Sequence, residues 1–328
     1  MKKLHVLILS RDRALQLDAT LRSLFLHAKN LQGISIFVLY RASSPRFLIQ
    51  YNQLIKEYPQ VYFTQESDFR RDLIKTLSES VSSSNKQWFQ FYAMINGLSF
   101  LQRHSIVELI IRALLLLNVK PGRHPLDLWS SGQYWLLSVD DNLFVRPIDF
   151  GNIIDSLETH PDAIGFSLRL GENITYCYMK NAPQRIPKFI RAGNDPDILI
   201  FEWENAEHDF AYPLEISSTI YRSSLIVPLV ASLYFTTPNM LESKLSSMKK
   251  WYAKKYPKLL CYSLSVSFCN PINKVQKDRP SNRSGTGSDF SIDRLADLFD
   301  EGKRIDVMAL SQFTPNACHQ EIDLRFEE

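Results

Sequence analysis

The sequence predicts an α/β protein built on a mixed, mostly parallel sheet that is flanked by helices. Short, continuous apolar runs bounded by turn residues recur along the chain, which is typical of strands buried on both faces. Between the first two runs, leucines follow the spacing of one helix face, so that strand, helix and strand alternate. This alternation indicates crossover connections, which parallel strands require.

The N-terminal part of the chain contains the clearest strand–helix–strand unit. Residues 4–10 are the first apolar run, residues 14–28 are the helix, and residues 34–40 are the second strand. We expect the crossover between these two strands to be right-handed. Residues 61–64 form a third short strand, reached through a helix that includes residues 47–57, and another helix follows over residues 68–81.

The middle of the chain differs in pattern. Residues 86–132 are apolar and helical in character, and we interpret them as a helical insertion. Within it, residues 106–117 are apolar nearly all round, so this segment should be buried in the protein or against a second copy in a homodimer. The sheet resumes at residues 134–139.

The second half alternates again and then becomes polar. The elements predicted there are a helix at 150–159, strands at 163–170, 198–201 and 216–221, and helices at 222–234 and 239–256. Residues 270–290 are rich in Pro, Asn, Ser and Gly, which predicts an exposed loop able to act as a lid. We expect one domain over 1–328, with 1–145 as its first half and 146–328 as its second.

Composition excludes several classes of protein. The 328 residues carry a net charge of +3 without a concentrated basic face, so we expect no nucleic-acid partner. None of the four cysteines forms a C-x-x-C pair, which leaves a zinc site or a redox pair unsupported. The first apolar run ends too early for a signal peptide, and no apolar stretch is long enough to span a bilayer. These features predict a cytoplasmic protein.

The helix at 239–256 bears on membrane contact. Leucines lie on one side of it and lysines cover much of the rest. Such a helix either packs on the core with its lysines in water, which we prefer, or lies in a membrane interface. The second interpretation would make the protein peripheral at the inner membrane.

The residues that carry chemistry follow the strand at 134–139. Asp140 and Asp141 end a fully apolar run, and Asn142 comes next. Two adjacent carboxylates repel each other, and burial raises that cost unless a cation neutralises them. A divalent ion that also binds phosphate oxygens would do so, and open α/β sheets bind ligands at this end of their strands. The alternative is an acidic turn that caps the next element.

Residues 137–147, Leu-Ser-Val-Asp-Asp-Asn-Leu-Phe-Val-Arg-Pro, resemble the metal-binding DXD segment of the GT-A glycosyltransferases. The resemblance implies a GT-A, Rossmann-like fold and a Mn²⁺ or Mg²⁺ ion held against the diphosphate of a nucleotide-sugar donor, with a UDP-sugar favoured. It implies Asp140, Asp141 and Asn142 as ligands, and His319 as a later one. Asn142 departs from the family pattern, where many relatives have a third acid.

Other segments agree with this resemblance in their order along the chain. The family's first strand leads to a turn that contacts the nucleotide, which residues 9–13 match here. The residues expected to contact the nucleotide donor are Ser10, Arg11, Arg13, Tyr40, Asp68, Arg71, Asp140 and Arg283. For the arginines after the first strand, the alternative is an ordinary surface position.

The acceptor side should lie after the metal segment. Residues 201–210 place acidic groups beside aromatic rings, a combination that suits a sugar. Asp209 is the preferred general base because Phe210 would partly desolvate it, and Glu204 and Glu215 are the alternatives. A solvated acidic loop would also have this composition.

The resulting hypothesis is a metal-assisted glycosyltransferase that moves a sugar from a nucleotide-diphosphate sugar to a hydroxyl of a glycan, lipid-linked or protein acceptor. One alternative is a non-catalytic sugar-binding, nucleotide-binding or scaffold protein on a degenerate transferase fold. A second is a sugar-1-phosphate nucleotidyltransferase. The absence of glycine from residues 10–13 argues against that enzyme, which needs a Gly-rich loop after its first strand.

Overall fold

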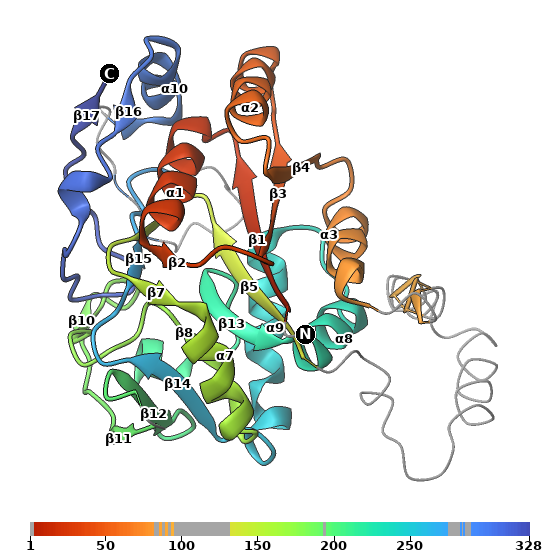
Figure 1. The fold of residues 1–328 in the computed structure, drawn as a ribbon, viewed down its shortest axis with the longest axis vertical. Coiled ribbons are helices and arrows are strands. Elements are labelled where there is room, and N and C mark those ends of the chain that lie inside the picture. Colours follow the sequence, from red (N-terminus) through yellow and green to blue (C-terminus); the bar gives the residue numbers. More distant parts are fainter. Residues whose placement is uncertain are drawn as a thin grey trace.

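The computed structural model describes residues 3–81, 85–86, 89–90, 93–94, 132–192, 195–274, 283, 285 and 290–328. Their centre is a nine-stranded sheet of order β11-β12-β14-β8-β13-β5-β1-β3-β4, with helices on both faces (Figure 1). The predicted α/β class, with a mixed, mostly parallel sheet, is confirmed. The predicted insertion at 86–132 lies almost entirely outside the described residues.

The main elements have the following bounds. The sheet strands are β1 (Lys3–Arg11), β3 (Ser35–Arg41), β4 (Val61–Gln65), β5 (Gln133–Val139), β8 (Ala163–Ser167), β11 (Ile190–Arg191), β12 (Ile198–Glu202), β13 (Ser218–Arg222) and β14 (Lys258–Tyr262). The helices are α1 (Ala14–His27), α2 (Pro45–Glu57), α3 (Phe69–Leu77), α7 (Phe150–Thr159), α8 (Ser223–Ser232), α9 (Pro238–Ala253) and α10 (Ile292–Asp300).

The sheet is parallel in its N-terminal half and mixed beyond it. β5, β1, β3 and β4 run parallel, whereas β13 is antiparallel to both β5 and β8. From β1 the chain moves outward to β3 and β4 and then returns to the other side of β1 as β5. The strand order therefore reverses between β1 and β5, and ligands of open α/β sheets bind at such a reversal.

The alternation of side chains along β1 explains the layers. Val6 and Ile8 belong to a core shared with α1, α2, α7 and α10, while Leu7 and Leu9 belong to a second core shared with α3, α8 and α9. Successive residues of a strand point to opposite faces, so one apolar run supplies both cores.

Several helix starts carry the expected capping residues. Ser44, Asp68, Thr237 and Ser291 each accept a hydrogen bond from the backbone N–H three residues later. α1 differs, because its N-cap is Arg13, whose side chain makes no capping bond. This leaves the Arg13 side chain available for contacts across the β1–α1 turn.

Two findings bear on the membrane interpretations. α9 buries Leu241, Leu245 and Ala253, whereas Lys244, Lys250 and the following Lys254 and Lys255 are exposed, as expected for a helix packed on the core. Among the described residues, no helix is long and apolar enough to cross a membrane.

The structure differs from the sequence expectation at several strands, of which two bear on the central sheet most directly. β14 was not predicted, although it lies inside the sheet between β8 and β12. The predicted strand at 163–170 ends at Ser167, after which Leu168 donates to the Ser218 carbonyl and accepts from the backbone N–H groups of Val266 and Ser267.

His5 should make stability fall on acidification. It is 1% exposed and stacks on Trp135, and burial lowers its pKa from 6.5 to about 4. Between pH 4 and pH 6.5, His5 is protonated in the unfolded chain and neutral in the folded chain. The folded state therefore keeps its full stability above pH 6.5 and loses stability as the pH falls towards 4. From pH 7 to pH 5, wild type should lose about 2 kcal/mol more free energy of unfolding than His5→Phe. Urea unfolding at both pH values measures this, and equal losses would contradict it.

Candidate functional site

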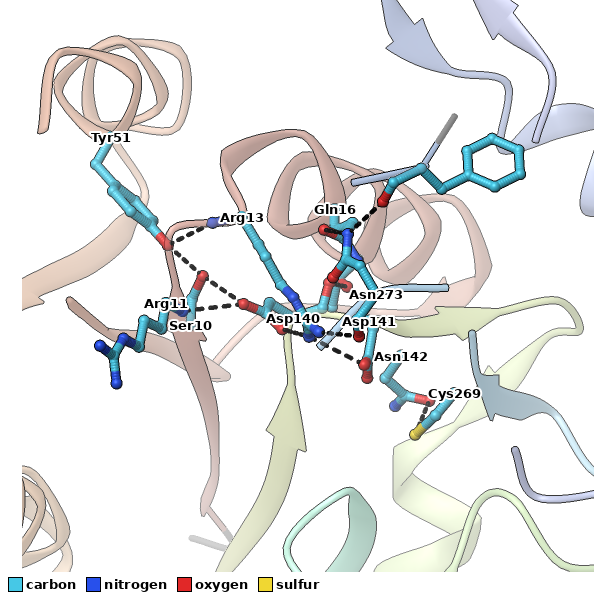
Figure 2. A network of polar contacts seen from close by, with 12 residues as sticks. Ser10, Arg11, Arg13, Gln16, Tyr51, Asp140, Asp141, Asn142, Cys269 and Asn273 are labelled. Carbon is cyan, nitrogen blue, oxygen red and sulfur yellow. Dashed lines mark hydrogen bonds and ion pairs between the residues drawn. The ribbon is translucent and has the colours of Figure 1, made fainter. Parts of the chain in front are cut away.

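The candidate site lies where β1 and β5 end side by side. Leu9 pairs with Val139 in the parallel ladder, and the Asp140 backbone N–H donates to the Leu9 carbonyl at 3.0 Å. Asp140 therefore follows β5 directly beside Ser10 of β1 (Figure 2). The register of two buried strands thus sets the position of the acidic segment.

Asp140 is held by residues of β1 and the β1–α1 turn. Its Oδ2 accepts from Ser10 Oγ at 2.9 Å and from the Arg11 backbone N–H at 3.0 Å. Its backbone carbonyl accepts from Thr20 Oγ1 of α1 at 2.9 Å. Asp140 is buried, and these three hydrogen bonds leave its carboxylate little freedom to move.

Arg13 joins Asp140 to Asp141. Its Nη1 lies 3.1 Å from Asp140 Oδ1 and 3.1 Å from Asp141 Oδ2, and Nη2 donates to the Asn273 carbonyl at 2.7 Å (Figure 2). The side chains of Arg13, Asp140 and Asp141 are 11%, 6% and 15% exposed. The two carboxylates are therefore neutralised in part by one guanidinium that bridges them.

The charges of this cluster affect one another strongly. Burial raises the pKa of Asp141 to about 6; the charge of Asp140 acts in the same direction, and Arg13 opposes both. Burial would lower the pKa of Arg13, but the two carboxylates outweigh it and raise that pKa. Two acids and one base leave one net negative charge, and Asp141 is the most exposed of the three side chains.

Tyr51 of α2 holds the β1–α1 turn through its hydroxyl group. Its hydroxyl lies 2.6 Å from Ser10 Oγ and accepts from the Arg13 backbone N–H at 3.3 Å. Tyr40 stacks on the Tyr51 ring, and burial raises the pKa of the Tyr51 hydroxyl, which therefore stays neutral. Asp12 takes a left-handed conformation (φ 55°), which Asp tolerates better than most residues, and this turns the chain so that Arg13 faces Asp140.

A small cavity lies next to the acidic pair. It has a volume of about 10 Å³ and is lined by residues of α1, the acidic pair, the 270–272 segment and the C-terminal segment. Its polar lining residues are Gln16, Asp140, Asp141 and Asn270. Such a volume holds about one water molecule or ion, so a nucleotide sugar would have to lie on the solvent side of it.

Two further predicted metal ligands point elsewhere. Asn142, in β6 (Asn142–Phe144), is fully buried, and its amide donates to Ser138 Oγ at 3.2 Å and faces Cys269 Sγ. His319 forms a backbone bridge with Cys269 of β15 (Ser267–Cys269), and its Nε2 lies 3.4 Å from Arg169 Nη1. Burial lowers the pKa of His319 to about 3, so its ring is neutral. The four-ligand metal set stays a prediction.

The described residues nevertheless fit one kind of metal site. They contain no group of three His, Cys, Asp or Glu side chains placed to hold an ion. Carboxylate oxygens are, however, the ligands that Mg²⁺ and Mn²⁺ prefer, and Mg²⁺ commonly rests on one or two carboxylates plus the phosphate oxygens of a substrate. Asp140 and Asp141 therefore fit an ion that arrives with a diphosphate better than a permanently bound one.

A second buried polar cluster surrounds Arg169, just after β8. Glu215 lies 3.4 Å from the Arg169 guanidinium, and its oxygens also accept from Ser217, Ser218 and Thr219. Glu215 is thus fully engaged, whereas Glu204 is exposed. These contacts leave Glu215 poorly placed to take a proton from a substrate, whereas Glu204 stays an alternative.

Asp209 belongs to the same cluster and is engaged less completely. Its Oδ2 accepts from Gln184 Nε2 at 3.3 Å, and its backbone N–H donates to Gln184 Oε1 at 3.1 Å. Burial raises its pKa, against the opposing charge of Arg169. A carboxylate with a raised pKa is a better proton acceptor than an ordinary surface acid.

The other residues expected at the nucleotide site are scattered. Asp68 caps α3 by accepting from the Arg71 backbone N–H at 2.7 Å, and Arg71 donates to Ser67 and Asp72. Arg283 donates to the Tyr178 carbonyl and lies over the Tyr178 ring. The structure brings together Ser10, Arg11, Arg13 and Asp140, with Tyr40 behind them. It does not join Asp68, Arg71 or Arg283 to that group.

Sequence reasoning missed several members of the site. These are Asp12, Gln16, Thr20, Tyr51 and Arg169. Asn270 and Asn273 belong to the segment predicted as an exposed loop at 270–290, but both are buried against the site. A signal existed for Arg169, because it is a charged residue within an apolar run. No comparable signal marks Tyr51, which lies among other aromatic and apolar residues of an amphipathic helix.

No protein-family model matches this chain. Among curated proteins it is similar to the bifunctional glycosyltransferase pgtA of Dictyostelium discoideum, with 26% identity over 300 residues. The match covers 83% of this chain and 32% of the relative, so the chain spans about a third of that protein's length. The resemblance to glycosyltransferases that residues 137–147 indicate is thereby confirmed.

Some solved structures resemble the fold at low sequence identity. TarS from S. aureus in complex with UDP has 13% identity and a TM-score of 0.38, covering 80% of this chain and 58% of that chain. A 4-diphosphocytidyl-2C-methyl-D-erythritol synthase has 10% identity and a TM-score of 0.37, covering 92% and 99%. Mouse xyloside xylosyltransferase 1 has 11% identity and a TM-score of 0.30, covering 76% of each chain.

Replacing Asp140 should cost more stability than replacing Asp141. Asp140→Asn loses a charge that accepts from Ser10, Arg11 and Arg13, so we expect the free energy of unfolding to fall by about 3 kcal/mol. Asp141→Asn should lower the free energy of unfolding by roughly a third as much. Of these three donors only Arg13 bonds to Asp141, and burial already disfavours the charged form of Asp141. Urea unfolding at pH 7 gives both values, and a larger loss for Asp141→Asn would contradict the described role of Asp140.

Proposed function

We propose that this relative of the GT-A glycosyltransferases transfers a sugar from a nucleotide-diphosphate sugar to an acceptor hydroxyl. The observation that carries the proposal is the position of the acidic pair. Asp140 and Asp141 follow β5 at the place where the strand order reverses between β1 and β5. A diphosphate bound there would meet the β1–α1 turn on one side and the acidic pair on the other.

We further propose that Mn²⁺ or Mg²⁺ joins the donor to Asp140 and Asp141. When bound, such an ion would neutralise the charge that develops on the departing nucleoside diphosphate. Asp141 would be its first ligand, because it is more exposed than Asp140, whose oxygens accept from Ser10, Arg11 and Arg13. A UDP-sugar remains the favoured donor.

Asp209 is the proposed general base for the acceptor hydroxyl. Its burial and raised pKa suit proton abstraction, while Arg169 would stabilise the carboxylate form. Glu215 would instead hold Arg169 in place, because its oxygens are taken by backbone and hydroxyl donors. The acceptor in this proposal is a glycan, a lipid-linked molecule or a protein.

Two alternative functions fit the same residues less well. A nucleotidyltransferase would need a glycine-rich loop after β1, whereas this turn is Ser10–Arg13 with Asp12 at positive φ. A non-catalytic sugar-binding or scaffold protein would have no need of a buried acid with a raised pKa such as Asp209. Donor turnover with Mn²⁺ separates the scaffold alternative from the transferase.

Asp141→Ala should abolish metal-dependent donor binding and leave the fold intact. With Mn²⁺ present, the affinity for a UDP-sugar should fall at least tenfold, to roughly the value measured without metal, because the more exposed ligand is lost. Calorimetric titration measures this. Asp293→Ala, an exposed acid in the first turn of α10, is the matched control and should bind like wild type. Unchanged nucleotide affinity in Asp141→Ala would rule out this site.

Asp209→Asn should slow transfer without weakening donor binding. We expect the rate of donor hydrolysis, with water as the acceptor, to fall by about two to four orders of magnitude, as is usual on loss of a general base. The control is Glu207→Gln, a partly exposed acid two residues before Asp209 that pairs with Arg185. Hydrolysis at the wild-type rate by Asp209→Asn would show that another group takes the proton.

A further inference from the structure

The guanidinium of Arg13 occupies the position between the acidic pair where a bridging cation would lie. Nη1 is 3.1 Å from an oxygen of each carboxylate. A cation held by these two oxygens would have to compete with Nη1 for them. Arg13 and a bridging divalent ion are therefore alternatives at this place, and they also repel each other.

The guanidinium is buried but incompletely satisfied. Nη1 and Nη2 donate to Asp140, Asp141 and the Asn273 carbonyl, while Nε is buried without a hydrogen-bond partner. An arginine fork forms its strongest contacts with phosphate or carboxylate through two parallel N–H groups. A diphosphate at the site would therefore offer Arg13 contacts that its present environment lacks.

Counting charges shows why metal and donor should bind together. Asp140 and Asp141 carry two negative charges and Arg13 one positive charge, which leaves one net negative charge. A divalent ion paired with a nucleotide-sugar diphosphate of about two negative charges adds no net charge, since it is a neutral pair. The ion alone would be repelled by the Arg13 guanidinium. The diphosphate alone would be repelled by Asp140 and Asp141.

We propose that Arg13 is an internal counter-ion that keeps divalent metal off Asp140 and Asp141 until the diphosphate of the donor draws the guanidinium away. This inference rests on the proposed function, since it takes the donor to be a nucleoside diphosphate derivative. It assigns Arg13 a positioning role that couples the binding of metal and donor. Metal and nucleotide each increase the affinity for the other because both act on one side chain.

The test is Mn²⁺ binding, followed by the electron paramagnetic resonance signal of free Mn²⁺ with the full chain at pH 7.5. In wild type, Mn²⁺ should bind weakly alone and at least tenfold more tightly when UDP is present. In Arg13→Gln, Mn²⁺ should bind at least tenfold more tightly than in wild type without UDP, and UDP should add little. Arg13→Gln/Asp141→Asn should lose this binding again.

Arg46→Gln is the matched control. It removes the same charge from α2, where Arg46 pairs with Asp297 and Asp300 away from the acidic pair, and it should bind Mn²⁺ like wild type. Equal Mn²⁺ affinities in wild type and Arg13→Gln would overturn the inference. So would wild-type Mn²⁺ binding that is equally tight with and without UDP.

A second measurement, the melting temperature, tests the inference even if Arg13→Gln is less stable than wild type. Without its counter-ion the acidic pair should lower the melting temperature of Arg13→Gln, and Mn²⁺ alone should raise it again by several degrees, with no such rise in wild type. A melting temperature of Arg13→Gln that does not respond to Mn²⁺ would contradict the inference. The proposed function fails separately, if wild type binds no Mn²⁺ even with UDP.

Discussion

Two neighbouring carboxylates at the end of a buried strand need a positive charge close to them, and the organisation of the site follows from this requirement. Asp140 and Asp141 leave β5 where the core is still close-packed, so water alone cannot screen them. Arg13 supplies the charge by reaching back across the turn from β1. The Asn273 carbonyl and the Tyr51 hydroxyl then fix that turn from two further segments.

The sheet makes this convergence possible. β1 and β5 are far apart in sequence but adjacent and parallel. Their C-terminal ends therefore bring Ser10, Arg13 and Asp140 together at one end of the sheet. β13 runs antiparallel beside β5, which brings the chain before it, with Glu215, to the same end of the sheet. Glu215 in turn holds Arg169, whose charge acts on Asp209. The Asp140 cluster and the Arg169 cluster thus lie at the same end of a single sheet.

The sequence predicted the α/β class and the acidic pair for clear physical reasons. Apolar runs mark buried strands, and charges that interrupt such a run must have compensation, which is why Asp140 stood out. The direction and order of the strands could not be predicted from the sequence. Periodicity does not show that β13 is antiparallel or that residues 258–262 enter the sheet as β14. Arg13 was expected to contact the donor, but its bond to Asp140 depends on strand register, which no local pattern encodes.

The most direct test of the central claim is a calorimetric screen of wild type against UDP-, GDP- and CMP-sugars, each with and without Mn²⁺. The account predicts that one nucleotide class binds and that its binding depends on Mn²⁺, because the acidic pair and the diphosphate share the ion. If no nucleotide sugar binds with any divalent metal, the Asp140 segment is an acidic turn neutralised by Arg13, and the scaffold alternative would replace the transferase.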